Sequence, residues 1–190
     1  MNIAYVLLHN GYADWEPASA LAELRRTFGF PVQALGLTHH PIVSMGGLNV
    51  TPDLSLAQFE PESAAILILP GGDFWTKAEI PEVSKALRSM IQLDRPVAAI
   101  CAATLALAHC GLLDERLHTS NGRNFIKQHV SNFRGEDFYR AVAAVSDRLV
   151  ITANGLAPFA FAAEIFRALA PERELDIQTY EKLYARGILD

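Results

Sequence analysis

Short apolar runs rich in Val, Ile and Leu alternate along the chain with segments of helical period. Uninterrupted apolar runs, typical of strands buried on both faces of a parallel sheet, occur at 3–8, 64–69 and 97–100. Further strands are predicted at 31–37, 117–120 and 149–153, and Gly46-Gly47 between 42–45 and 48–51 predicts a hairpin. The pattern therefore predicts a central sheet with a small hairpin beside it.

Helices are predicted where apolar residues recur every three or four positions, at 14–27, 81–93, 101–110, 123–130, 158–169 and 174–186. Asp14 is expected to cap the first helix, and Gly111 to end the third. Because helices separate the strands, we expect βαβ units, with helices on both faces of a mostly parallel sheet. The sequence has no repeat, linker or low-complexity tract, so residues 1–190 are interpreted as one α/β domain.

Composition and charge exclude several classes of protein. Apolar residues make up 51% of the sequence and charged residues 19%, which excludes a mainly disordered chain. Sixteen Lys and Arg against 21 Asp and Glu give a net charge of −5, without a basic patch for nucleic acid or an anionic membrane. No apolar stretch approaches the ~20 residues of a spanning helix, and the N-terminus lacks a signal peptide. We expect a cytoplasmic protein without nucleic-acid or membrane partners.

Cys101 is the strongest candidate for chemistry. It follows the strand 97–100 directly, and ligands of such sheets bind outside the carboxyl ends of the strands. A sharp turn from strand to helix needs small neighbours, here Ala99 and Ala103, and the helix N-terminus should lower the thiol pKa. The alternative is a small core residue, which is how we interpret Cys110. On one helix the two cysteines would lie about 13 Å apart, too far for a disulfide, so both should be reduced.

Two further features could serve a nucleophile at this position. Gly71-Gly72 follows a buried strand, and its backbone together with the N–H of Ala102 could bind an oxyanion; the alternative is an ordinary turn. Glu16 lies in the first turn of the first helix. There it either complements the helix dipole or reaches Cys101 as a protonated hydrogen-bond donor and general acid–base.

The other candidate motifs are absent or weak. The six histidines lack the spacing of a zinc site, although His9 follows the first strand and could face the site. Nucleotide, dinucleotide and serine-hydrolase motifs are also missing from the sequence. We therefore expect neither a metal nor a cofactor.

Five segments together resemble the ThiJ/PfpI family, which includes the Parkinson-disease-associated deglycase and belongs to the class I glutamine amidotransferase-like superfamily. In family order they are 11–17 (GYADWEP), 69–72 (LPGG), 98–103 (AAICAA), 111–113 (GLL) and 152–158 (TANGLAP). The resemblance implies a flavodoxin-like three-layer sandwich with Cys101 as the nucleophile at the elbow and Glu16 as its acidic partner. It also implies Gly72 and Ala102 as oxyanion donors in a cofactor-free, cytosolic homodimer.

One position departs from the family pattern. Many members carry a histidine after the strand that follows Gly-Leu-Leu, and this chain has Asn121 there. An amide can orient a substrate but cannot accept a proton near neutral pH. His118, expected on the opposite face of a strand, would not replace the histidine. The H-x-E pair of glutamine amidotransferases is absent as well, so we expect neither glutaminase nor protease activity.

The leading hypothesis is therefore an enzyme that acts on a small carbonyl or amide compound. Cys101 would add to the carbon, Glu16 would move the proton, and Gly72 and Ala102 would hold the oxyanion. Two alternatives remain open. One is a redox-responsive stress protein whose Cys101 is oxidised and held by Glu16, with little turnover, and the other is a binding or scaffold domain.

Overall fold

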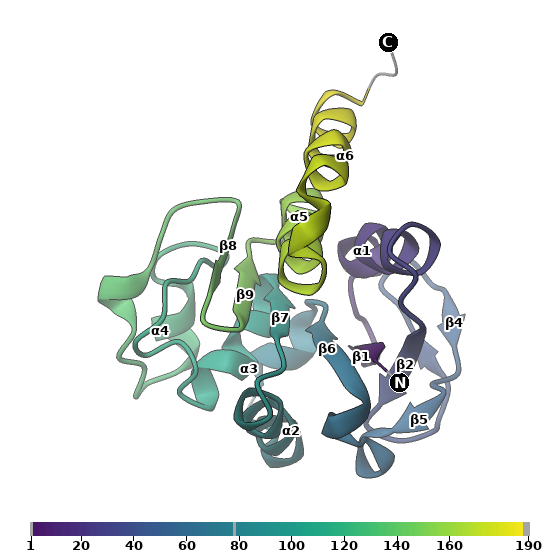
Figure 1. Cartoon of the computed structure of the whole chain (residues 1–190). Coiled ribbons are helices and arrows are strands. Elements are labelled where there is room, and N and C mark those ends of the chain that lie inside the picture. Colours follow the sequence, from purple (N-terminus) through teal and green to yellow (C-terminus); the bar gives the residue numbers. More distant parts are fainter. Residues whose placement is uncertain (1, 78, 188–190) are drawn as a thin grey trace.

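The computed structural model describes residues 2–77 and 79–187 and has a seven-stranded sheet between two layers of helices (Figure 1). The sheet strands are β1 (Ile3–Leu8), β2 (Val32–Gly36), β5 (Leu54–Ser55), β6 (Ala64–Leu69), β7 (Val97–Ile100), β8 (Ala144–Asp147) and β9 (Val150–Ala153), and β3 (Ile42–Val43) and β4 (Asn49–Val50) form a separate hairpin. The α-helices are α1 (Trp15–Arg26), α2 (Pro81–Gln92), α3 (Thr104–His109), α4 (Phe125–His129), α5 (Pro158–Leu169) and α6 (Glu174–Arg186).

The order of the strands in the sheet is β5-β2-β1-β6-β7-β9-β8. Neighbouring strands are parallel except for the antiparallel pair β8–β9 at one edge. The predicted α/β fold with a mostly parallel sheet is therefore confirmed. Because β1, β6, β7 and β9 are parallel and adjacent, the segments that follow them meet at one end of the sheet.

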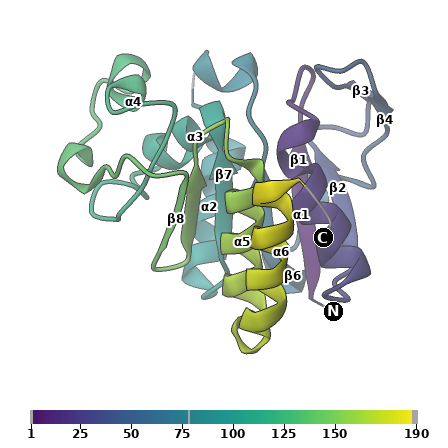
Figure 2. The ribbon, with the colours of Figure 1, turned by 90° about the horizontal axis from the view of Figure 1, so that it is seen from above.

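Side chains of the central strands point alternately into two hydrophobic cores. Residues 3, 5 and 7 of β1 pack with α2 and α3, and residues 4, 6 and 8 pack with α1, α5 and α6. Figure 2 shows α1, α5 and α6 together on one face of the sheet. Burial on both faces explains why β1 and β6 are continuous apolar runs rather than alternating ones.

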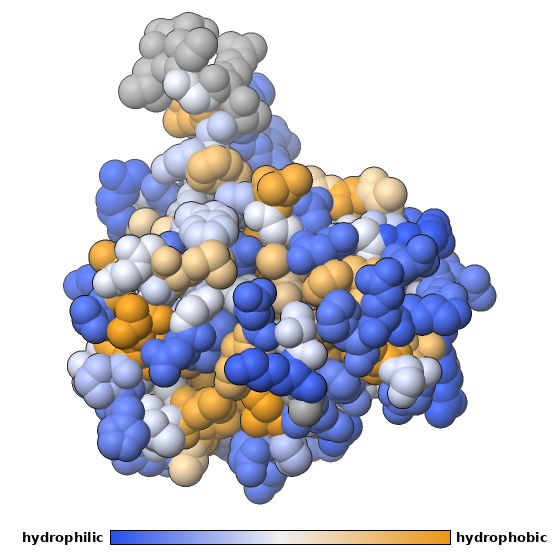
Figure 3. Space-filling view, turned by 180° about the vertical axis from the view of Figure 1, so that it is seen from behind, coloured by the Kyte–Doolittle hydropathy of each residue, from blue (hydrophilic) through white to orange (hydrophobic). Residues whose placement is uncertain are grey.

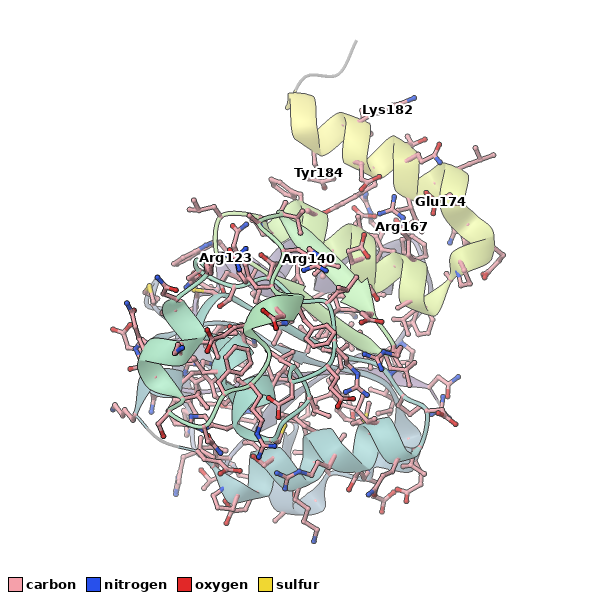
Figure 4. The ribbon with its side chains drawn as sticks, turned by 90° about the vertical axis from the view of Figure 1, so that its left-hand side faces the viewer. Arg123, Arg140, Arg167, Glu174, Lys182 and Tyr184 are labelled. Carbon is pink, nitrogen blue, oxygen red and sulfur yellow. The ribbon has the colours of Figure 1, made fainter. Side chains whose placement is uncertain are left out.

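An ion cluster connects α5 to α6. Arg167 of α5 lies 3.1 Å from Glu164, 3.2 Å from Glu174 and 2.7 Å from Glu181, and Figure 4 shows Arg167 and Glu174 on adjoining helices. Hydrogen bonds from Arg167 to Glu181 and Glu174 raise the pKa of the Arg167 guanidinium above its ordinary value. The cluster holds the first two turns of α6, from Glu174 to Glu181, against α5, and the end of the helix leads away from the body of the molecule (Figure 1).

The apolar side chains are gathered mainly in the two cores. On the face seen in Figure 3, hydrophilic side chains separate several smaller hydrophobic patches. Among the helices that the structure describes, none has the length and apolar character needed to cross a membrane.

Two predicted elements take a different form. The predicted helix 101–110 begins as a 3-10 turn over Cys101–Ala103, and α3 starts only at Thr104, because Cys101 has a positive φ of 60° that an α-helix does not accept. The predicted strand 117–120 is reduced to a single bridge between His118 and Tyr139.

Other expectations missed short or polar features. The strands β5 and β8 were not predicted, since β5 has two residues and β8 is a half-exposed edge strand. Asp14 stands at the N-cap of α1, but its carboxylate accepts hydrogen bonds from Ser44 Oγ (2.5 Å) and Gly46 N (3.0 Å) and so holds the β3–β4 hairpin. Of the predicted domain 1–190, residues 1, 78 and 188–190 lie outside the described residues.

The orientation of α5 can be tested by two substitutions on the same helix. Phe161 is fully buried in the core, whereas Phe159 is 42% exposed. Phe161→Ala should lower the free energy of unfolding by about 3–5 kcal/mol, and Phe159→Ala by about 1 kcal/mol or less. Urea denaturation followed by circular dichroism measures both, and equal losses would show that the buried face of α5 is assigned wrongly.

Candidate active site

Cys101 lies at a sharp turn where β7 ends. Its φ of 60° is in the left-handed region, which is costly for a side-chain-bearing residue, by about 1–3 kcal/mol. The turn brings its half-buried side chain to the place where segments following β1, β6 and β9 meet. These segments supply Glu16, Gly71 and Gly155, so residues far apart in sequence converge on the thiol.

Two glycines lie directly against the thiol. A methyl group on Gly71 would lie 2.7 Å from Cys101 Cβ and 2.8 Å from Glu16 Oε2, and one on Gly155 would lie 2.9 Å from Cys101 Sγ and 3.3 Å from Glu16 Oε1. Both distances to Cys101 are shorter than carbon side chains accept, so any other residue at either position would displace the thiol. The sulfur and the carboxyl thus share one tightly packed space between two strand ends.

Glu16 is almost completely buried, with 1% of its surface exposed. Its Oε2 accepts a hydrogen bond of 2.6 Å from the backbone N–H of Gly71. Burial raises the pKa of the Glu16 carboxyl, while the hydrogen bonds from Gly71 and Cys101 act in the opposite direction. The direction agrees with the expectation of a carboxyl that can hold a proton beside the sulfur.

The thiol pKa of Cys101 is raised, not lowered as expected from the helix N-terminus. Burial has the largest effect, the hydrogen bond from Asn121 opposes it, and the charge of Glu16 raises the pKa further. The helical dipole is weak here because the segment after Cys101 is a 3-10 turn and a six-residue helix. The N–H of Ala102 also donates toward the sulfur and acts to lower the thiol pKa.

Asn121 bridges the sulfur and the end of β9. Its Nδ2 donates to Cys101 Sγ at 3.0 Å, and its Oδ1 accepts from the N–H of Gly155 at 3.0 Å. The backbone donor fixes which end of the amide faces the thiol, since only the oxygen can accept. Asn121 therefore acts on the thiol as a hydrogen-bond donor.

Buried hydroxyl groups hold the Asn121 segment against the elbow. Thr104 Oγ1 donates to the carbonyl of Cys101 at 2.8 Å and pairs with Ser120 Oγ at 2.7 Å. Thr152 Oγ1 of β9 accepts a hydrogen bond of 2.9 Å from the backbone N–H of Thr119 in the same segment. These contacts link β9, the elbow and Asn121 into one rigid unit.

The thiol opens onto a cleft of about 780 Å³. Its walls combine Glu16, Cys101 and Asn121 with apolar side chains, of which Trp15 is 50% and Leu156 is 96% exposed at the surface. The volume is within the usual range for a small-molecule site. A ligand in this cleft would contact the sulfur directly.

Gly72 and His118, which the sequence also singled out, do not face the Cys101 thiol. Gly72 has a φ of 149°, and its α-carbon faces His9 and Gly11 rather than the thiol, so its role as an oxyanion donor stays a prediction. His118 is fully buried against the rings of Phe133 and Tyr139, away from the sulfur as expected.

Cys110 and His9 are also placed outside the cleft. Cys110 is 8% exposed and its thiol donates to carbonyls of its own helix, with burial raising its pKa to about 11. His9 is buried in a stack with Phe74, and burial lowers its pKa. In the described ranges, no three His, Cys, Asp or Glu side chains are grouped to hold a metal ion.

Two contributions were not predicted from the sequence. Gly71, rather than Gly72, touches Cys101 and binds Glu16, and Gly155 orients Asn121 through its backbone N–H. In the sequence, Gly71 and Gly155 are recognisable only as glycines two residues after a buried strand. The sequence does not indicate which side chains such a glycine contacts.

Comparison with known proteins identifies the family of the chain. The model of the DJ-1/PfpI family matches residues 2–168. The chain belongs to the DJ-1/PfpI family. The family resemblance seen in the sequence is therefore confirmed, and the three-layer fold is the one expected for it.

Individual relatives agree with this assignment over most of the chain. The Bacillus subtilis protein YoaZ, named as an uncharacterized protease, is 36% identical over 172 residues, covering 87% of this chain and 82% of its own length. The Caenorhabditis elegans glutathione-independent glyoxalase DJR-1.2 is 27% identical over 148 residues, 76% of this chain and 77% of its own. The crystal structure of the DJ-1 superfamily protein Atu0886 from Agrobacterium tumefaciens is 37% identical and superposes with a TM-score of 0.86, over 97% of this chain and all of that one (100%).

The hydrogen bond from Asn121 can be tested through the thiol pKa. Its N–H stabilises the thiolate, so Asn121→Ala should raise the thiol pKa by about one unit, the effect expected for a part-exposed hydrogen bond to a charged group. The pH dependence of iodoacetamide alkylation, read on the Cys101 peptide, measures the change. The exposed Asn124 gives the matched control, and an unshifted profile in Asn121→Ala would remove the amide from the site.

Proposed function

We propose that this protein is a cysteine-dependent enzyme that consumes small carbonyl compounds, with aldehydes as its substrates. Cys101 is the nucleophile, Glu16 is the acid–base group, and Asn121 orients the sulfur. The observation that carries the proposal is the packing of one thiol and one buried carboxyl between Gly71 and Gly155, at the floor of an open cleft.

The reaction begins with addition of the thiol to the carbonyl carbon. Sulfur forms the new bond to carbon, and the electron pair of the C=O bond moves to oxygen. The thiol proton passes to the Glu16 carboxylate and from there to that oxygen, which gives a hemithioacetal. A carboxyl whose pKa is raised toward the working pH suits both transfers, because it accepts and returns a proton with little cost.

Backbone donors are available for the developing oxyanion. The N–H of Gly71 is already bound by Glu16, which leaves the N–H of Gly72 as the donor that this loop can offer to a substrate. The N–H of Ala102 lies at the elbow, close to the sulfur. Together they fit the role of an oxyanion hole.

The names of the relatives support a carbonyl substrate. DJR-1.2 is named a glutathione-independent glyoxalase, and a Thermococcus kodakarensis protein that is 28% identical over 116 residues is named a deglycase. YoaZ is named a protease. Cleavage of an amide also requires protonation of the leaving amine. The Asn121 amide cannot act as a second acid–base group for that step, so we consider aldehydes better substrates than amides.

The redox alternative is a second candidate for the same cysteine. Oxidation of a resting thiol proceeds through the thiolate, and burial together with the charge of Glu16 raises the thiol pKa of Cys101. Those effects favour a thiol that loses its proton only when a substrate is present.

The assembly is proposed on the family resemblance alone. We propose a cytoplasmic homodimer without a cofactor.

Turnover of methylglyoxal tests the proposed function. The wild-type protein should consume methylglyoxal, Cys101→Ser should be inactive, and Glu16→Gln should lose about a hundredfold in rate, as is typical for a lost acid–base group. Cys110→Ser makes the same chemical change at the buried cysteine outside the cleft and should retain the wild-type rate. Glutamine and a fluorogenic peptide should not be hydrolysed.

Three results would contradict the proposal. Consumption of methylglyoxal that persists in Cys101→Ser would assign the activity elsewhere. Hydrolysis of glutamine that depends on Cys101 would show that the amide at position 121 is not limiting. Oxidation of the Cys101 thiol to a sulfinate by dilute peroxide, in a protein that does not turn over aldehydes, would favour the redox alternative.

A further inference from the structure

We propose that the substrate of this cleft carries a carboxylate beside its carbonyl group, and that Arg123 is the residue that recognises this charge. The inference rests on the proposed function of Cys101 and names the substrate class of the same site. Its basis is the segment 122–143, which borders the cleft and has a net charge opposite in sign to that of the molecule as a whole.

Residues 122–143 form a segment that contributes to one wall of the cleft. This segment carries four Lys or Arg and two Asp or Glu, a net charge of +2, whereas the whole chain has a net charge of −5. Five residues of the segment line the cleft together with Cys101, namely Gly122, Tyr139, Ala141, Val142 and Ala143. A segment that borders the cleft is therefore positive in an otherwise acidic protein.

Arg123 is held against this wall by an aromatic ring. Its Cζ lies 5.1 Å from the centroid of the Tyr139 ring, within the range of a cation–π contact, and it directly follows Gly122 of the cleft wall. In the part of the chain that the structure describes, no carboxylate lies within 4.0 Å of its guanidinium. Arg123 is thus an exposed, positioned cation that is not neutralised by an ion pair.

A second arginine, Arg140, binds the backbone beside Tyr139. Arg140 donates from one guanidinium nitrogen to the carbonyls of Asp137 and Tyr139, both at 3.0 Å. Figure 4 shows Arg123 and Arg140 near each other on one side of the molecule. Of the two acids in this segment, Glu136 is paired with Lys127 at 2.7 Å, and Asp137 is exposed without a salt bridge to either arginine.

The floor of the cleft offers little repulsion to an anion. Glu16 is the acidic side chain among the described lining residues, and it is buried with a raised pKa. The Asn121 amide presents a hydrogen-bond donor there, beside the sulfur. A carbonyl carbon at the sulfur and a carboxylate toward Arg123 would therefore each meet a complementary group, as in an oxo acid such as glyoxylate.

Two alkylating reagents of equal size test this inference. Iodoacetate and iodoacetamide attack the same thiolate with the same leaving group, but only iodoacetate carries a carboxylate. The ratio of their rates at Cys101, measured by peptide mapping at one pH, cancels any change in the thiol pKa or in the fold. The ratio therefore reports the charge of the cleft alone.

Arg123→Gln should lower the iodoacetate-to-iodoacetamide ratio about threefold, the size expected for an exposed charge pair. Arg123→Lys should keep most of the wild-type ratio, because it keeps the charge. Arg25→Gln removes an exposed charge from α1, away from the cleft, and should leave the ratio unchanged. Raising the salt concentration to about 1 M should reduce the wild-type ratio toward that of Arg123→Gln.

The outcomes separate this inference from the function on which it rests. If Cys101 reacts with both reagents and Arg123→Gln leaves their ratio unchanged, the carboxylate site is overturned while the proposed nucleophile stands. An equal fall in Arg25→Gln would overturn it too, since the effect would then be one of net charge. If neither reagent modifies Cys101 in the wild-type protein, the proposed function is overturned and the inference falls with it.

Discussion

The packing of the Cys101 side chain between Gly71 and Gly155 is the constraint on which the rest of the site depends. A positive φ points the side chain out of the sheet, and the two glycines leave room for the sulfur and for one carboxyl beside it. The strain of that backbone, about 1–3 kcal/mol, is tolerated because the parallel strands on either side are buried on both faces. The fold thus holds a reactive group in a position that a flexible loop would not maintain.

This packing also determines the electrostatics of the thiol. Burial and the neighbouring Glu16 oppose the thiolate, while donors from Asn121 and Ala102 stabilise it, and burial has the largest effect. A buried carboxyl next to a buried thiol cannot readily carry a second negative charge. We infer that the pair holds one proton between its two members, which suits a nucleophile that becomes charged only as it reacts.

Much of this arrangement was predictable from the sequence. Continuous apolar runs such as 64–69 identified strands buried on both faces, and the rule that ligands bind at strand ends selected Cys101 before any contact was known. The local sequence did not reveal that Cys101 interrupts a helix, because its positive φ is imposed by packing. The predicted helix N-terminus also suggested a lowered pKa for the Cys101 thiol, because the local sequence does not show how deeply the thiol is buried.

The partners of the site residues were harder to predict. Asn121 was recognised as a departure from the family pattern, but its bond to the N–H of Gly155 joins two loops 34 residues apart. The position of Arg123 over Tyr139 depends in the same way on the path of a segment that contains the short helix α4 and one 3-10 turn. Such contacts follow from the tertiary fold and leave no periodic signal in the chain.

The central claim, that Cys101 and Glu16 are electrostatically coupled, is tested most directly by titrating the thiolate absorbance at 240 nm in the wild-type protein and in Glu16→Gln. The Cys110→Ser background removes the second thiol. The account predicts a wild-type midpoint above that of free cysteine, about 8.5, and a lower midpoint in Glu16→Gln, because the substitution removes the negative charge that opposes the thiolate. A wild-type midpoint below that of free cysteine, or the same midpoint in both proteins, would contradict it.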